Sequence, residues 1–526
     1  MIETEVHQRL RAYLREQGHT QWPHHLTMAR LVARALRVGR SALLQIDSLA
    51  AYQGSHRLSY LMPALLWPEP AVLALPSKIL ETVLLQDIPN LQQGLPVVKS
   101  VQLGDRWPHE DFRGLLVTSA EDWLGDRLHP LLYPATEQRF PAGIPTLIEG
   151  VGDLERWIRN YLTVAVSASD WESLMLAYPS QRALIRDLRV RITHAVFQHP
   201  ANPYGCHLID GAEQALLQAL YDAVKAYGDD GQMPARWRRF WQQFSQRERL
   251  AWSRLDRETG RMELCCGPTD IQAQLAPVWT QQPVVLIGAA LEASAKAERY
   301  RDRLGLGEMT CLRFCPDQRN DLVQLYLPDR LPMPNTSHFK SAALQEIRSL
   351  LGARDALESE ASPTVILVGD VPLKAQFATI LAAEFGSRVQ VEAAVGPQGI
   401  LVAGWEYWRS HQAEVATPGL LIITTLPIPS LENPLVAGRV ATYKRRHQDW
   451  FKAYLLPEAL GALQHAVAPM RAHQGVVALL DNRVSYRSYG RQILAALSPA
   501  ARSSYLHEDW FNPAASALST EGGDRY

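Results

Sequence analysis

The sequence of 526 residues lacks an apolar run long enough to cross a bilayer, for which about 18 consecutive apolar residues are needed. Residues 1–7 are polar and acidic, and they do not contain the apolar segment of a secretory signal peptide. We therefore expect a cytoplasmic protein with no membrane partner.

Cysteine is scarce, with five in the chain. Cys311 and Cys315 are close in sequence, but the adjacent Cys265 and Cys266 form a poor second pair for one tetrahedral metal site. We expect free thiols at these positions and at Cys206, and no metal site.

An excess of charge of either sign is also missing. The chain carries 53 Lys and Arg residues against 54 Asp and Glu residues, which gives a formal net charge of −1. A nearly neutral chain exerts no overall electrostatic attraction on nucleic acid, so any such binding depends on local basic patches.

A chain of this length is too long for one hydrophobic core, and about three domains are expected. Over residues 1–167, short apolar runs alternate with amphipathic segments such as residues 27–38 and 58–66. This alternation predicts an α/β domain, with a parallel sheet covered by helices on both faces. The strands expected here lie at residues 41–45, 71–75, 115–118 and 146–148.

The middle of the chain has a different pattern. Residues 168–265 show long helical periodicity, and we expect them to form a helical insertion without strands. A strand at residues 283–287 then indicates that residues 266–327 return to the first α/β domain.

The last part of the chain resumes the alternation. The proline-rich residues 328–335 are expected to be a linker, at the start of a second α/β domain over residues 328–526. Its expected strands lie at residues 364–368, 389–392, 400–402, 420–423 and 476–480.

The segment between the expected strand 41–45 and helix 58–66 has the setting of a phosphate-binding loop but little of its chemistry. Such a loop needs several glycines, a lysine, and a Ser or Thr hydroxyl for magnesium. Here Gly54 and Ser55 are followed by His56 and Arg57, where the lysine and the hydroxyl would fall. A basic helix start can bind an anion; an ordinary solvated loop is the interpretation that we favour.

Several stretches resemble one known family, the DinG branch of the XPD-like superfamily 2 DNA helicases. The resemblance spans roughly residues 20–165 and 270–500 and is strongest in the second α/β domain. The stretches that carry it are residues 84–91, 331–336, 421–429 with 433–435, and 480–483 with 489–490. It implies two RecA-like parallel-sheet domains that close on ATP, with an α-helical insertion in the first domain.

The ATP-contacting motifs that the resemblance implies are degenerate. Beyond His56 and Arg57, the family's acidic box reads Glu149-Gly150, so a glycine replaces the carboxylate that would activate water, although Glu149 could still hold magnesium. The final motif keeps Gln464 and Arg471 but has lost one arginine. For Glu149, Gln464 and Arg471, a role in capping or local polar contacts is the alternative that we favour.

Other family features are altered as well. The expected Ser-Ala-Thr-Leu motif appears as residues 288–291 without its hydroxyls, and the Trp-Glu-Gly motif is intact at neither Trp405 nor Trp408. No cysteine stands near residues 104–108, where the first ligand of the family's iron–sulfur cluster would lie. We expect no such cluster, and binding of ATP and magnesium is doubtful.

Two basic clusters are candidates for contact with single-stranded DNA or another nucleic acid. In the insertion, Arg236, Arg238 and Arg239 are interleaved with aromatic residues that could stack on bases. Trp237 and Trp241 are four residues apart, however, which is also the spacing of a helix core, and we favour that alternative. Lys444 and Arg445 form the second cluster, for which a solvated helix face is the alternative.

The sequence thus predicts a helicase-fold protein that is catalytically degenerate, a pseudo-helicase, and that binds nucleic acid or a protein partner. A divergent but active ATP-dependent DNA helicase and a purely structural subunit of a larger assembly are the two alternatives.

Overall fold

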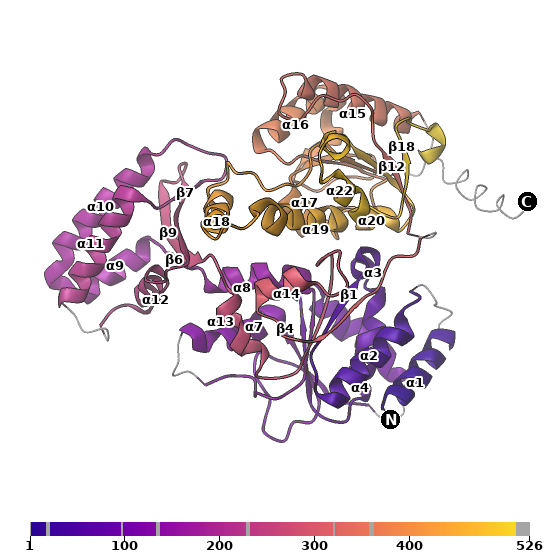
Figure 1. The fold of residues 1–526 in the computed structure, drawn as a ribbon, viewed down its shortest axis with the longest axis horizontal. Coiled ribbons are helices and arrows are strands. Elements are labelled where there is room, and N and C mark those ends of the chain that lie inside the picture. The colour runs from indigo at the N-terminus through magenta and orange to yellow at the C-terminus, as the bar shows by residue number, and fades with distance from the viewer. Residues whose placement is uncertain are drawn as a thin grey trace, which may run out of the picture.

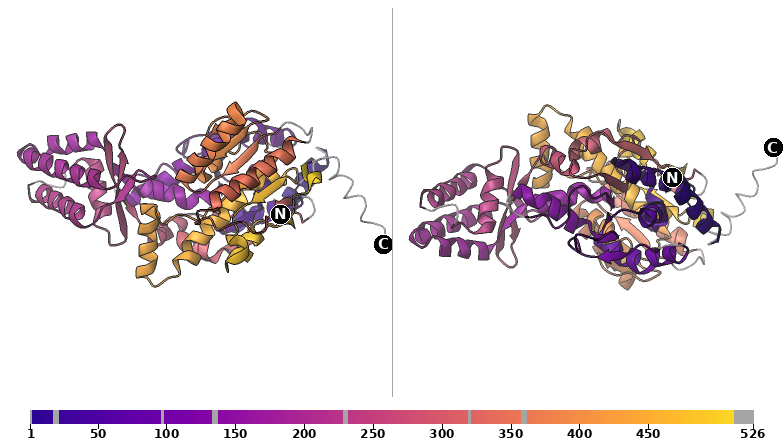
Figure 2. Two further views of the ribbon diagram at one scale, coloured as in Figure 1. Left: turned by 90° about the horizontal axis from the view of Figure 1, so that it is seen from above. Right: turned by 90° about the horizontal axis from the view of Figure 1, so that it is seen from below.

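The computed structural model describes residues 2–16, 22–95, 98–132, 137–227, 232–318, 321–356 and 362–511. They form two α/β domains and an insertion that projects from the first domain (Figures 1 and 2). Within these ranges every helix is too short or too polar to span a bilayer.

The first domain is built on a seven-stranded sheet in the order β11-β1-β10-β5-β2-β4-β3, in which all neighbours are parallel. Its buried strands are short, continuous apolar runs, as expected for a parallel sheet covered on both faces. The strands are β1 (Ala42–Ile46), β2 (Ala71–Leu75), β3 (Val101–Leu103), β4 (Leu115–Ser119), β5 (Thr146–Glu149), β10 (Val284–Ala289) and β11 (Thr310–Arg313).

Neighbouring residues of one strand enter opposite cores, since side chains alternate across a sheet. Leu44 of β1 packs with α1 (Ile2–Glu16), α2 (His25–Val38) and α4 (Leu58–Leu66). Leu43 packs on the other face, with four further helices of this domain. These are α7 (Ala120–Leu132), α8 (Leu154–Leu162), α13 (Gln272–Trp279) and α14 (Glu298–Leu304).

The second domain has a seven-stranded parallel sheet in the order β14-β15-β13-β16-β17-β12-β18. Its strands are β12 (Val323–Tyr326), β13 (Thr364–Leu367), β14 (Val389–Val391), β15 (Ile400–Ala403), β16 (Leu420–Ile423), β17 (Val476–Leu479) and β18 (Ala500–Ser503). Strand β12 precedes the proline-rich residues 328–335, so the chain enters this sheet before the segment expected to be the linker.

Helices cover both faces of the second sheet. One core contains α15 (Phe339–Asp355) and α16 (Val371–Phe385). The opposite core contains α17 (Trp405–His411), α19 (Leu456–Ala466) and α22 (Gly490–Ala496). The expected fold class, two parallel-sheet domains with an insertion in the first, is confirmed.

The expectation that the insertion contains no strand is wrong. An antiparallel sheet in the order β6-β9-β8-β7 joins it to the first domain, with strands β6 (Val164–Val166), β7 (Cys206–Leu208), β8 (Arg249–Asp256) and β9 (Arg261–Pro268). Its outer part is helical, with α9 (Ala168–Ala177), α10 (Arg182–Gln198), α11 (Gly211–Tyr227) and α12 (Ala235–Phe244). The apolar residues 250–252 of β8 are flanked by Arg249 and by Ser253 and Arg254, so the strand offers no apolar run as long as those of the buried parallel strands.

Ion pairs join the two α/β domains. Arg409 of α17 contacts Asp153, which lies just before α8, and Arg156 Nη1 lies 3.3 Å from Glu406 Oε1. Helix α18 (Pro434–Arg445) of the second domain reaches the insertion sheet, where its Gly438 packs against Leu250. The insertion is thus supported by both domains (Figure 1).

Candidate functional site

The segment expected to be a phosphate-binding loop is a short helix, α3 (Ser48–Gln53), followed by a 3₁₀ turn over Ser55–Arg57. The Asp47 carboxylate caps this helix, because Oδ1 accepts a hydrogen bond of 2.7 Å from the Ala50 amide. Asp47 Oδ2 accepts a second hydrogen bond of 2.7 Å from Trp22 Nε1. An amide that a phosphate would need is therefore already bonded within the chain.

His56 points into the interior of the first domain and is fully buried. Its Nδ1 lies 3.0 Å from the carbonyl oxygen of Ala50, and its Nε2 lies 3.2 Å from Glu149 Oε1 at the end of β5. Its ring is thus fixed between the loop and the neighbouring strand and does not face solvent.

Arg57 folds back in the same direction. Its Nε lies 3.4 Å from Glu149 Oε1, and its Nη1 lies 3.7 Å from Asp87 Oδ2. Gly54 makes room for this conformation, since a Cβ at Gly54 would lie 2.6 Å from Arg57 Nη1. The remaining glycine of the loop therefore accommodates the chain's own guanidinium group.

Glu149 is the centre of this cluster and is 6% exposed. The Tyr60 hydroxyl donates a hydrogen bond to Oε2, while His56 and Arg57 approach Oε1. Burial alone would raise the pKa of Glu149, but these partners lower it to about 2. The carboxylate is therefore ionised, and both oxygens have partners from its own domain.

Gly150 has a left-handed backbone, with φ of +77°, and its surroundings are closed. A Cβ at this position would lie 2.6 Å from Cγ of Pro76 and 3.3 Å from Cη2 of Trp157. The backbone thus leaves no space for a carboxylate at the position where the family resemblance implies one.

Arg471 of α20 (Ala468–Arg471) is buried and serves the second domain itself. Its guanidinium group donates to the carbonyl oxygens of Asp321, Leu497 and Pro499 at 2.7, 2.8 and 3.0 Å. Burial lowers the pKa of Arg471 to about 10. Its hydrogen-bonding capacity is directed to the chain's own backbone.

The structure brings the remaining motif residues together only in part. Gln464 and Arg471 line a small cavity of about 50 Å³ that also includes Asp47 at the start of α3. His56 and Glu149 do not line this cavity, and both are buried within the first domain. The residues expected around one nucleotide thus lie in two separate groups.

The basic cluster of the insertion lies on α12, whose aromatic residues are in the core. The Trp237 ring is fully buried, its Nε1 donates to the carbonyl oxygen of Asp170 at 2.8 Å, and it stacks on the buried Trp241 ring. Neither ring can stack on a base in this structure. Arg236 and Arg238 are exposed, and Arg239 is half-buried.

The second basic cluster lies at the end of α18. Lys444 and Arg445 are both exposed, with the Lys444 ammonium 5.6 Å from the centre of the Trp450 ring. Arg445 Nη2 donates to Thr442 Oγ1 at 3.0 Å. This is the more accessible of the two predicted nucleic-acid contacts.

The sequence analysis missed the groups that complete the Glu149 cluster. Tyr60 lies four residues after His56, and this spacing places two side chains on the same side of a helix. This spacing could have predicted that Tyr60 lies beside His56. Asp87 comes from a separate helix and carried no such signal. Among the described residues, no group of three or more His, Cys, Asp or Glu side chains is placed to hold a metal ion.

Known proteins give a consistent comparison, although no family model matches the chain. The YoaA ATP-dependent DNA helicase of Escherichia coli K12 is 34% identical over 106 residues, which are 20% of this chain and 17% of that protein. YoaA of Haemophilus influenzae is 24% identical over 233 residues, 43% of this chain and 36% of that protein. The chain is related to the YoaA helicases. The matches span well under two thirds of either YoaA protein.

Solved structures with the same fold include XPD helicases. Xpd4 of S. tokodaii has a TM-score of 0.59 at 12% identity, covering 92% of this chain and all of Xpd4. A second XPD helicase has a TM-score of 0.57 at 9% identity, covering 92% of this chain and all of that chain. These likenesses concern the fold, and with the YoaA matches they confirm the predicted relationship to XPD-like superfamily 2 helicases.

Proposed function

We propose that this chain is a pseudo-helicase: a helicase-fold protein that does not hydrolyse ATP and that binds nucleic acid or a protein partner. The observation that carries the proposal is the cluster around Glu149. This carboxylate, at the position where the family resemblance implies a magnesium contact, is paired with His56, Arg57 and Tyr60 of its own domain.

Magnesium and triphosphate would have to displace these internal partners. Moving His56 and Arg57 away would break a buried, paired cluster, and binding of magnesium would have to offset that loss. If they stay, the positive charge of Arg57 opposes a cation at Glu149. The closed space around Gly150 and the internal bonding of Arg471 act in the same direction, since both remove groups that would stabilise the transition state of phosphoryl transfer.

One observation favours the alternative of a divergent but active helicase, namely the relationship to the YoaA ATP-dependent helicases. The third hypothesis is a purely structural subunit. It requires that the exposed basic residues have no role in binding nucleic acid.

A measurement of ATP hydrolysis distinguishes the pseudo-helicase from the divergent active helicase. Phosphate release and ATP binding are measured with magnesium, with and without single-stranded DNA, on the wild-type chain and on His56→Gln and Glu149→Gln. We expect no release above the protein-free rate and no stimulation by DNA in any of the three. Stimulated hydrolysis that disappears in either variant would support the active helicase.

A measurement of single-strand binding distinguishes the pseudo-helicase that binds nucleic acid from the purely structural subunit. Lys444→Glu with Arg445→Glu reverses two exposed charges, and Arg238→Glu with Arg239→Glu reverses one exposed and one half-buried charge. Neither pair removes a core side chain. We expect at least one pair to weaken binding of a labelled single strand and to flatten its salt dependence. A matched reversal, Arg348→Glu on α15, lies outside both clusters. A wild-type chain without affinity for any strand would favour the structural subunit.

A further inference from the structure

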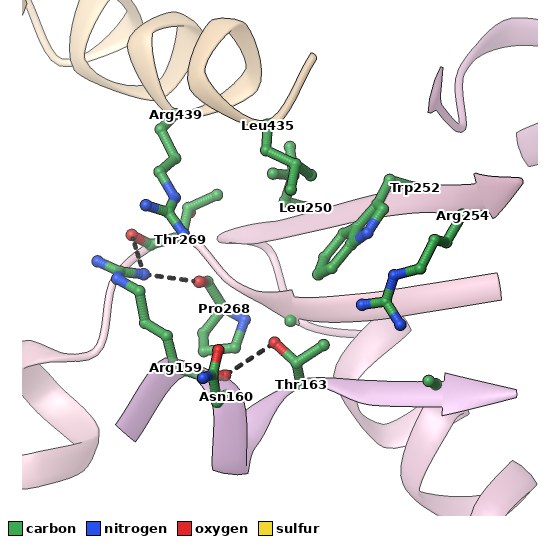
Figure 3. Close-up of a pocket in the computed structure, with 12 residues that line it drawn as sticks. Arg159, Asn160, Thr163, Leu250, Trp252, Arg254, Pro268, Thr269, Leu435 and Arg439 are labelled. Carbon is green, nitrogen blue, oxygen red and sulfur yellow. Dashed lines mark hydrogen bonds between the residues drawn. The ribbon is translucent and has the colours of Figure 1, made fainter. Parts of the chain in front are cut away.

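A cavity of about 430 Å³ lies where the first domain, the insertion and the second domain meet. Helix α8 forms its floor, the insertion sheet forms one wall, and α18 crosses above it (Figure 3). No part of it coincides with the Glu149 cluster or with the small cavity beside Arg471.

The alternation of strand β8 creates the wall of this cavity. Ala251 and Leu255 point into the helical core of the insertion, whereas Leu250, Trp252 and Arg254 point to the cavity. The alternation of the strand thus places Trp252 and Arg254 on the face that lines the cavity.

Two glycines bring the neighbouring elements close to this wall. A Cβ at Gly438 of α18 would lie 2.4 Å from Leu250 Cδ1, and a Cβ at Gly267 of β9 would lie 2.6 Å from Thr163 Oγ1. Both positions need the absence of a side chain for the observed packing. The cavity is therefore a consequence of close packing around it and not of a loose junction.

The polar lining of the cavity is basic. Arg159, Arg254 and Arg439 line it, together with Asn160 and Thr163, and no carboxylate is among the described lining residues. Arg159 pairs with Glu155 at 2.9 Å and its Nη1 donates to the carbonyl oxygens of Pro268 and Thr269 at 3.0 and 3.2 Å, so its Nη2 is the nitrogen left for a ligand (Figure 3). Arg254 pairs with Glu263 at 2.8 Å. Arg439 differs: among the described residues no carboxylate lies within 4.0 Å of its guanidinium group, which donates to the Tyr454 hydroxyl at 3.3 Å.

The cavity therefore combines guanidinium groups, an aromatic ring and a volume of about 430 Å³. The guanidinium groups of Arg159 and Arg439 approach one another on one side, and Trp252 presents its ring on the other (Figure 3). Trp252 is 8% exposed, so the accessible part of its ring is confined to this place. Guanidinium groups bind phosphate, aromatic rings stack on bases, and the volume lies within the range typical of small-molecule sites.

We propose that this junction cavity binds one nucleoside monophosphate unit, with its phosphate on Arg159 and Arg439 and its base against Trp252. The unit is either a free nucleotide or one nucleotide of a single strand. In the second case the inference rests on the proposed function, because it gives the nucleic-acid binding a defined place.

The test uses the full chain and two probes. Thymidine monophosphate is titrated by calorimetry, and a fluorescein-labelled oligothymidylate by anisotropy, with inorganic phosphate and oligoglutamate as competitors that supply charge without a base. The variants are Arg439→Gln, Trp252→Leu and Arg254→Gln. Arg388→Gln, which removes a comparable arginine paired with Asp355 far from the cavity, is the control.

We expect Arg439→Gln and Trp252→Leu each to weaken the bound probe about tenfold, since each removes a phosphate or base contact of ordinary strength. Arg254 is largely exposed, so its variant keeps the fold and is expected to weaken binding less, by about threefold. Arg388→Gln is expected to bind like the wild type. This pattern with either probe supports the cavity.

The other outcomes are distinguishable. Binding of the free nucleotide without the strand supports the cavity but contradicts nucleic-acid binding in the proposed function. Strand binding that none of the cavity variants changes overturns the cavity and leaves the proposed function standing. Competition by oligoglutamate or phosphate as strong as that by the nucleotide overturns the proposal, because the site would then respond to charge alone. Absence of binding by both probes overturns it as well.

Discussion

His56 Nε2 lies 3.2 Å from Glu149 Oε1 inside the first domain. This contact joins the segment after β1 to the end of β5, the two places at which a RecA-like domain would hold a nucleotide. Both groups are buried, so the contact belongs to the interior of the domain. A place expected to bind a ligand is therefore part of what stabilises the fold.

The first prediction concerns the stability that Glu149 contributes. Glu149→Gln keeps the size of the side chain but removes the negative charge that pairs with Arg57. Because breaking a buried pair leaves the partners uncompensated, we expect the free energy of unfolding to fall by about 3 kcal/mol. Urea unfolding measures the change. Glu384→Gln, which breaks a surface pair with Arg348, is the control and is expected to leave the midpoint unchanged. Equal midpoints for the two variants would contradict the prediction.

The second prediction compares two glycines with similar backbones. Gly150 and Gly143 have φ of +77° and +82°, but a Cβ meets Pro76 at 2.6 Å at Gly150 and nothing within 4 Å at Gly143. Gly143→Ala is expected to cost about 1 kcal/mol, from backbone strain alone. Gly150→Ala adds a clash with a rigid ring, and we expect a further loss of about 2 kcal/mol. Thermal and urea unfolding measure the free energy of unfolding of both variants. Equal losses of stability would show that Pro76 moves aside for the added methyl group.

The third prediction concerns stability in acid. Burial, with His56 and His24 nearby, lowers the pKa of His25 from 6.5 to about 4. Below pH 6.5 the unfolded chain therefore binds a proton that the folded chain does not, so stability falls from about pH 6.5 towards pH 4. His25 contributes up to about 3 kcal/mol.

Urea midpoints measured across this range test the effect. His25→Gln can keep a hydrogen bond to Ser59 and is expected to flatten the pH dependence. His447→Gln, changed on the exposed surface, should leave the dependence unaltered. A His25→Gln curve parallel to that of the wild type would contradict the assignment.

The two parallel sheets could be predicted because their central strands are continuous apolar runs. Leu420–Ile423 is buried at every position, and no other element type fits so short a run between helices. Strands β8 and β9 could not be predicted in this way. Their charged residues face the junction cavity or solvent while alternate residues face the insertion core, and only the pairing partner reveals that arrangement.

The candidate site was predictable in composition but not in orientation. The sequence predicted that His56 and Arg57 replace the usual lysine and hydroxyl, and it favoured a solvated loop over an anion site. The solvated loop is wrong, because the His56 ring is fully buried and the Arg57 side chain is 12% exposed. The structure gives a third answer, in which both turn inward to Glu149. Orientation depends on Gly54, on the Asp47 cap and on contacts from distant strands, none of which is encoded in local spacing.

The fourth prediction tests the role of Trp237. Its ring is fully buried and lies 4.7 Å, centre to centre, from the Trp171 ring. Trp237→Ala is expected to destabilise the insertion by about 3–5 kcal/mol, since it leaves a large cavity. Hydrogen exchange of α9 and α12 measures this locally. Arg236→Ala, one residue away and exposed, should leave exchange unchanged. If Trp237→Ala left the stability of the insertion unchanged but lowered the affinity for a single strand, the ring would contact nucleic acid instead of serving the core.

The fifth prediction concerns the contact between the two α/β domains. Arg409 of α17 pairs with Asp153, and the neighbouring Glu406 pairs with Arg156, so the two domains are joined by charges of alternating sign. Arg409→Glu would place a negative charge against Asp153 and beside Glu406. We expect the contact to weaken by about 1 kcal/mol, within the range measured for partly exposed pairs.

Hydrogen exchange measures this weakening without any ligand. About 1 kcal/mol corresponds to a roughly fivefold faster exchange of the amides around Asp153 and in α17, provided that these amides exchange by separation of the domains. High salt should produce a similar change in the wild type, because it screens the same pairs. Arg348→Glu, a reversal against Glu384 within the second domain, is the matched control and should leave the contact intact. Unchanged exchange in Arg409→Glu would mean that other contacts, such as Arg303 with Glu458 and Arg446 with Asp270, suffice to hold the domains together.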